Sequence, residues 1–110
     1  MEKIQRKLEK FSRDREWGKF HTPRNLAESI VLEASELLEH FQWQLKDKNL
    51  TRKQLEGIKE EAADVFIYLV EFCRIVNIDL IAATEAKIAK NAKRYPISKA
   101  RGNAKKAAKR

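Results

Sequence analysis

Two pairs of acidic residues recur with the same spacing in the middle of the chain. Glu33 and Glu36 form the first pair, and Glu61 and Asp64 form the second pair 28 residues later. Residues at positions i and i+3 are neighbours on a helix surface, so each pair would present two carboxylates side by side. Four carboxylates brought together without a cation repel one another and take up protons. The chemistry that this pattern favours is therefore a shared cation site.

The residues around each pair follow the period of an amphipathic helix, at about 100° per residue. Apolar side chains form one stripe in each segment: Ile30, Ala34, Leu37, Leu38 and Phe41 in the first, and Ile58, Ala62, Val65 and Leu69 in the second. Each acidic pair lies along one edge of its stripe, and His40 or Tyr68 follows seven residues after the first acid. A short connection favours antiparallel neighbours. The sequence alone does not decide whether the two acidic edges face each other or the solvent.

The donor set of the four acids indicates which metal the site would bind. Carboxylate oxygens favour a hard cation, Mg²⁺ first, with Mn²⁺ able to replace it. A di-iron site in a helical bundle needs Glu-x-x-His pairs, but the residues three before His21 and His40 are Gly18 and Leu37. A zinc site would need a Cys/His cluster, which the chain lacks. The competing interpretation is that the acids are solvated helix faces, since charged residues make up 36% of the chain.

The composition favours an all-α chain, because only three glycines and two prolines occur among 110 residues. Helices are predicted at residues 2–13, 23–44, 51–76 and 80–93. Thr22-Pro23 begins the second helix, Thr51 with Gln54 forms a capping box for the third, and Asp79 caps the fourth. Four helices with short loops predict a compact four-helix bundle, with residues 1–95 as its domain.

The net charge of +8 is concentrated at the C-terminal end of the chain. Residues 96–110 contain six cations and no acid, which leaves +2 for the rest. A flexible basic tail is favoured there over an arm that binds nucleic acid.

The single cysteine, Cys73, lies near the apolar stripe of its helix, so we expect a buried, inert thiol. One cysteine allows no intrachain disulfide, which is typical of the reducing cytoplasm. The apolar runs are too short to span a membrane, and no signal-peptide pattern opens the sequence. The expected location is therefore cytoplasmic.

The chain resembles the all-α nucleoside triphosphate pyrophosphohydrolases of the MazG-like superfamily, and most of all their small dCTP pyrophosphatase branch. The family signature E-x-x-E, spacer, E-x-x-D reads here as residues 33–36, 24 intervening residues and residues 61–64. Further segments match in the same order: REWGKFHTPRNL, ELLEHFQW, DVFIYL and the pattern K-x-x-x-N-x-x-R-Y-P. The resemblance covers about residues 11–96 and leaves out the lysine-rich tail.

This resemblance implies Mg²⁺-dependent hydrolysis of a (deoxy)nucleoside triphosphate, dCTP or a related dNTP, to the monophosphate and pyrophosphate. A role in house-cleaning of the nucleotide pool would fit the family. By the family's motif, the metal ligands and catalytic residues are Glu33, Glu36, Glu61 and Asp64. A bound Mg²⁺ neutralises developing phosphate charge and lowers the pKa of a water.

The resemblance also implies which residues contact the substrate. Lys87, Asn91 and Arg94 lie on one helix face, where they would contact phosphate and sugar, and Tyr95 would close the pocket. The competing interpretation is that they are only a solvated basic stripe near the C-terminal end of a helix. Aromatic rings that stack on a base are expected in the base pocket. The candidate substrate-binding residues are Trp17, His21, Trp43, Tyr68, Lys87, Asn91, Arg94 and Tyr95.

Further apolar residues exceed what one small bundle can cover, namely Phe66, Ile67, Val70 and Ile75. We therefore expect a homodimer or a tetramer built from two dimers. Two other functions compete with the enzyme. One is a non-catalytic helical oligomer that binds nucleic acid through its basic tail, and the other is a nucleotide binder that keeps the metal site without turnover.

Overall fold

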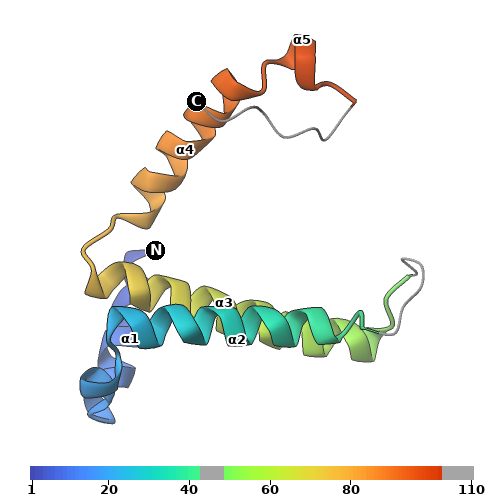
Figure 1. Cartoon of the computed structure of the whole chain (residues 1–110). Helices are drawn as coiled ribbons and strands as arrows, with labels where there is room; N and C mark the ends of the chain where they lie inside the picture. Colours follow the sequence, from blue (N-terminus) through green and yellow to red (C-terminus); the bar gives the residue numbers. More distant parts are fainter. Residues whose placement is uncertain (43–48, 103–110) are drawn as a thin grey trace. The chain divides into compact units, whose positions relative to one another are not determined.

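The structure is a computed structural model that describes residues 1–42 and 49–102. It divides into two units, Met1–Ile78 and Asp79–Arg110, which are described separately. The first unit contains the helices α1 (Glu2–Asp14), α2 (Pro23–Glu39) and α3 (Arg52–Ile75) and the 3₁₀ helix η1 (Trp17–Phe20), and the second contains α4 (Leu80–Arg94) and α5 (Ile97–Ala100) (Figure 1). The described residues form helices and no strands, so the predicted all-α fold class is confirmed.

The starts of the three longest helices follow from their caps. The Thr22 hydroxyl oxygen accepts a hydrogen bond from the backbone N–H of Asn25 at 3.1 Å, and Pro23 occupies the first turn of α2. Thr51 and Gln54 form the predicted capping box of α3, with distances of 3.1 and 2.9 Å. The Asp79 carboxylate caps α4 in the same way. These side chains satisfy N–H groups that have no partner within the helix.

The end of α2 differs from the prediction. The helix ends at Glu39 instead of continuing toward Gln44, because the backbone N–H groups of residues 40–42 bond to carbonyls three residues back. Gln44 itself lies outside the described residues. Two short elements were not predicted, namely η1, which follows Glu16 in a left-handed conformation (φ 53°), and α5.

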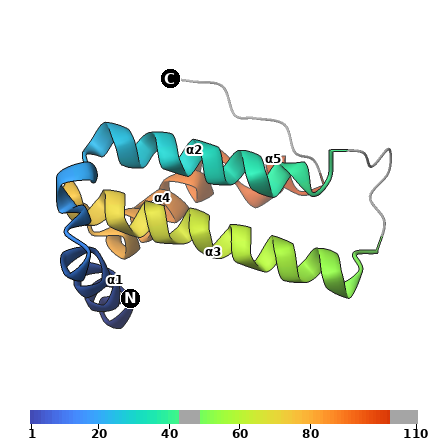
Figure 2. The same ribbon diagram turned by 90° about the horizontal axis from the view of Figure 1, so that it is seen from below.

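Helices α2 and α3 lie side by side and antiparallel in both views, as the short connection predicts (Figures 1 and 2). The core of the first unit is small: Leu26, Val70 and Cys73 are almost fully buried, so Val70 belongs to this core and not to the uncovered apolar surface expected from the sequence. The expectation of a buried Cys73 thiol is therefore confirmed, and burial raises its pKa. The apolar stripes are covered only in part, since Leu38 remains 68% exposed. The contact between α2 and α3 covers a narrower band of each helix than the apolar stripe predicted from the sequence.

No helix in residues 1–42 and 49–102 is long and apolar enough to cross a membrane.

Candidate functional site

The acidic edges of α2 and α3 face each other. Carboxylate oxygens of Glu33, Glu61 and Asp64 lie within 4.8 Å of one another. Glu36 adjoins this group, because it raises the pKa of both Glu33 and Glu61. The sequence left open whether the two acidic edges face each other or the solvent. In the structure the two acidic pairs converge. We call these four residues the acidic cluster.

Electrostatics in the acidic cluster favour protonated carboxyl groups when no cation is present. Burial, the hydrogen bond from Glu36 and the neighbouring negative charges raise the pKa of Glu33 to about 7. The same causes raise the pKa of Glu61, although the charge of His40 opposes them. Burial and the charges of the cluster also raise the pKa of the Tyr68 hydroxyl. At neutral pH the cluster therefore retains a proton that an incoming cation would displace.

Two carboxylate oxygens in the cluster test whether these residues fit a metal ion. Glu33 Oε2 and Glu61 Oε2 are both buried, and neither has a hydrogen-bond partner among the described residues. A buried carboxylate oxygen without a donor is costly. A divalent cation would satisfy both atoms at once, and an all-oxygen donor set suits a hard cation. The residues therefore fit such an ion.

A cavity of about 350 Å³ adjoins the acidic cluster. Asp64 belongs to both, and the cavity wall also includes Phe11, Trp17, His21 and Tyr68, from α1, the η1 segment and α3. The Trp17 ring meets the Phe11 ring edge to face, with centroids 5.5 Å apart, and lies 6.3 Å from the His21 ring. Concave, mostly apolar sites of this size bind small flat molecules. Three of the predicted substrate residues are thus brought together beside the cluster.

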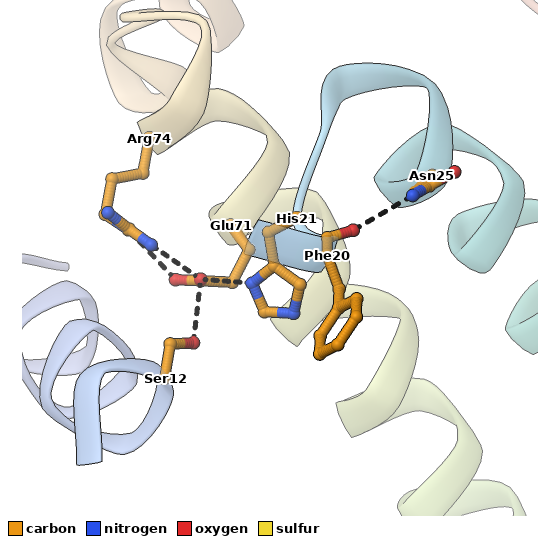
Figure 3. A network of polar contacts seen from close by, with 6 residues as sticks. All are labelled: Ser12, Phe20, His21, Asn25, Glu71 and Arg74. Atoms are coloured by element: carbon orange, nitrogen blue, oxygen red, sulfur yellow. Dashed lines mark hydrogen bonds and ion pairs between the residues drawn. The ribbon is translucent and has the colours of Figure 1, made fainter. Parts of the chain in front are cut away.

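The chain between η1 and α2 holds His21 in this wall. The backbone N–H of His21 donates to the carbonyl of Gly18 at 3.2 Å. The side-chain amide of Asn25 donates to the carbonyl of Phe20 at 3.0 Å (Figure 3), while Thr22 caps α2. These bonds at the start of α2 explain why the segment FHTPRN places an imidazole at this point.

His40 lies at the C-terminal end of α2, over a glycine of α3. A Cβ atom at Gly57 would come within 2.6 Å of His40 Cε1, so the ring occupies the space that a side chain at position 57 would fill. This contact holds His40 near Glu61, whose pKa its charge lowers. A glycine inside a helical pattern was the sequence signal for this close approach.

A buried polar group in the wall of the cavity was not predicted from the sequence. Glu71 is only 2% exposed, and Arg74 donates to both of its oxygens, at 3.1 and 2.9 Å. The Ser12 hydroxyl donates to Glu71 Oε2 at 3.3 Å, and His21 Nδ1 lies 3.5 Å from the same oxygen (Figure 3). The available signal was spacing, because Glu71 continues the helix face of Asp64 and Tyr68 at intervals of four and three residues.

The remaining candidates lie elsewhere. Lys87, Asn91 and Arg94 are on α4 and Tyr95 is its C-cap, all in the second unit, so their contact with substrate stays a prediction. The Arg94 guanidinium lies 5.8 Å from the centroid of the Tyr95 ring. Trp43 lies outside the described residues.

Comparisons with known proteins agree with this architecture. The sequence model of the MazG-like family matches residues 29–109, which include most of the predicted tail. The chain is 37% identical over 108 residues to dCTP pyrophosphatase 1 of Mus musculus and 36% identical over 110 residues to that of Homo sapiens. These alignments cover 94% and 96% of this chain but 64% and 65% of the relatives, so the chain spans about two thirds of their length.

A solved structure extends the likeness to the fold. The crystal structure of a pyrophosphatase from Archaeoglobus fulgidus matches with a TM-score of 0.75 and 40% sequence identity, covering 87% of this chain and 92% of that one. The acidic signature, the helical architecture and these similarities lead to one conclusion: the chain belongs to the MazG-like family.

Proposed function

We propose that this protein hydrolyses a deoxynucleoside triphosphate, dCTP or a related dNTP, to the monophosphate and pyrophosphate. The observation that carries the proposal is the convergence of Glu33, Glu61 and Asp64, with two buried oxygens lacking a donor, at the edge of an aromatic cavity. The names of its relatives, dCTP pyrophosphatase 1 and a pyrophosphatase, support the same reaction. House-cleaning of the nucleotide pool and a cytoplasmic location belong to this proposal.

The acidic cluster would hold Mg²⁺, with Mn²⁺ able to replace it, through Glu33, Glu36, Glu61 and Asp64. When bound, the cation supplies charge neutralisation at the phosphates and lowers the pKa of a water. The four carboxylates fix the position of that charge, and one that is not fully engaged accepts the proton of the attacking water. Asp64, which the cluster shares with the cavity, sets the point at which the triphosphate meets the base pocket.

The aromatic cavity would receive the nucleobase. Trp17 offers a flat ring for stacking, and His21 and Tyr68 offer polar atoms in the same wall. Trp43 is proposed to complete the base pocket. The positive side chains of Lys87 and Arg94, together with Asn91 and Tyr95, are proposed to contact phosphate and sugar.

The exposed apolar side chains of α2 support a homo-oligomer, either a dimer or a tetramer. Val31, Leu32 and Leu38 are each more than 60% exposed in the single chain. A second copy of the chain would remove this surface from water. Light scattering coupled to gel filtration should give a mass at least twice the 12.9 kDa of one chain. A monomeric mass at micromolar concentration would contradict this assembly.

The reaction is tested by identifying its products. Purified protein is incubated with Mg²⁺ and each dNTP in turn, and the nucleotides and phosphates are separated by ion-exchange chromatography. We expect monophosphate and pyrophosphate in equal amounts, highest with dCTP or a related dNTP, and no release in EDTA. Stepwise release of orthophosphate, or hydrolysis that persists in EDTA, would contradict the proposed reaction.

A further inference from the structure

Glu71 belongs to the wall of the cavity, and its side chain is almost fully buried there. With 2% exposure it would be costly as an unpaired charge. Arg74 compensates that charge by donating to both oxygens, and Ser12 adds a third donor at Oε2. Glu71 is therefore held as an anion in one orientation. The remaining polar neighbour of Oε2 is the ring of His21.

This fixed anion determines which nitrogen of His21 carries the hydrogen. His21 Nδ1 is buried, has no hydrogen-bond partner in the part of the chain that the structure describes, and lies 3.5 Å from Glu71 Oε2. A lone pair on Nδ1 would face a negative oxygen, whereas an N–H there is attracted to it. The electrostatics therefore favour the tautomer with hydrogen on Nδ1. In the neutral ring Nε2 is then an acceptor.

The acceptor atom is directed away from the buried network. In Figure 3 the second ring nitrogen of His21 lies on the side opposite Glu71, and His21 lines the cavity together with Trp17. A base that stacks near Trp17 with its edge turned toward His21 would meet this acceptor. An exocyclic amino group can donate to it, whereas a carbonyl at the same place would set two acceptors against each other.

We propose that Glu71 is a positioning residue that fixes His21 with hydrogen on Nδ1, so that Nε2 selects nucleobases carrying an exocyclic amino group. This inference rests on the proposed function in taking the cavity as the base pocket. Glu71 lines the cavity, but Arg74 and Ser12 already occupy both of its oxygens, so it acts on the base through the imidazole. Because Arg74 already binds both oxygens, an amide at position 71 would direct an N–H₂ group toward Arg74 or His21. In Glu71→Gln the hydrogen of His21 should therefore no longer be fixed on Nδ1.

The first experiment measures the tautomer without any catalysis. Nitrogen-15 NMR of the metal-free protein distinguishes a protonated from an unprotonated ring nitrogen. We expect wild-type His21 to carry its hydrogen on Nδ1, and Glu71→Gln to populate the tautomer with hydrogen on Nε2. Wild-type protein with hydrogen on Nε2, or an unchanged spectrum of His21 in the variant, would overturn the proposal.

The second experiment measures base selection with deoxycytidine and deoxyuridine, again without metal. These nucleosides lack phosphate, so the test stays decisive even if the protein hydrolyses no triphosphate. Deoxycytidine would gain one hydrogen bond with Nε2, whereas deoxyuridine would place a second acceptor against it. This difference predicts that the wild type binds deoxycytidine about tenfold more tightly than deoxyuridine. Calorimetry should show this preference falling to about threefold or less in Glu71→Gln. An undiminished preference in the variant, or no preference in the wild type, would overturn the proposal.

A substitution at His21 separates the two nitrogens and serves if Glu71→Gln does not fold. His21→Asn places an amide nitrogen near the position of Nδ1, which keeps a donor toward Glu71 and removes the acceptor at Nε2. We expect a melting temperature close to that of the wild type together with loss of the deoxycytidine preference. Retained preference in His21→Asn would show that Nε2 does not read the base.

Discussion

Helix α3 carries two groups of carboxylates that the protein treats in opposite ways. Glu71 is buried against Arg74 and Ser12, whose donors occupy both of its oxygens. Glu61 and Asp64, less than three turns earlier, converge with Glu33 of α2, and two of their buried oxygens have no donor among the described residues. The chain itself balances the charge of Glu71, whereas the carboxylates of Glu33, Glu61 and Asp64 are left unbalanced.

The difference shows where the chain depends on a ligand. A carboxylate with an internal counter-ion keeps its charge and can orient a neighbour such as His21. Carboxylates without one repel each other, and burial together with this repulsion raises the pKa of Glu33 to about 7. A cluster of this kind can be balanced by protons or by a bound cation, and such clusters are typical of functional sites.

The largest expected effect comes from removing one charge of the acidic cluster. Asp64→Asn or Glu36→Gln should lower pyrophosphate release by about a thousandfold or more, because the cation contributes several kcal/mol at the transition state. The melting temperature of the metal-free protein should not fall, since each change relieves repulsion. Release within tenfold of the wild type would mean that the cluster is not the catalytic metal site.

A loss of stability is expected when Glu71 loses the arginine that balances its charge. Arg74→Met should lower the free energy of unfolding by about 2 kcal/mol, less than for a fully buried pair because Arg74 is 26% exposed. Urea denaturation measures this change, and Arg24→Met is the matched control. The Arg24–Glu28 pair is exposed, so its loss should cost less than about 1 kcal/mol. Equal costs for the two variants would remove the distinction between the two groups of carboxylates.

Stability should depend on pH through Glu33. The pKa of Glu33 is raised in the folded state, so its proton binds more tightly there, and the stability it contributes is lost as pH rises from about 4.5 through 7. The melting temperature of metal-free protein should therefore fall across this range, and fall less in Glu33→Gln. Identical pH profiles for the two proteins would contradict the raised pKa.

The smallest effect is expected at the contact between His40 and Gly57. Gly57→Ala would push a Cβ atom into the His40 ring and displace its charge from Glu61. We expect metal affinity to fall by about tenfold, at the lower end of the loss seen for groups that support metal ligands from behind. Gly18→Ala is the matched control, because no atom lies within 4 Å of a Cβ there. Equal metal affinity in both variants would show that His40 does not support the cluster.

Much of the fold was predictable because its signals are local. Thr22, Thr51 and Asp79 cap their helices as the sequence indicates, since a cap depends on residues only three positions apart. The end of α2 was not predictable, because the apolar period continues past Glu39 while the backbone turns. Leu38 shows the same limit: periodicity gives a face but not how much of it a neighbour covers.

The site was predictable to a similar degree. The paired spacing of Glu33, Glu36, Glu61 and Asp64 identified the acidic cluster, but its convergence required the register between α2 and α3. The network of Ser12 and Glu71 was missed because its members are 59 residues apart and each reads as an ordinary polar helix residue.

The most direct test of the central claim is a calorimetric titration of the metal-free protein with Mg²⁺ at pH 7, in two buffers with different heats of ionisation. With a pKa of about 7, Glu33 is roughly half protonated before the cation arrives. Binding should therefore release protons, visible as a heat that depends on the buffer, and Glu33→Gln should reduce this dependence. Binding of Mg²⁺ with no proton release, or no binding at millimolar Mg²⁺, would contradict the account.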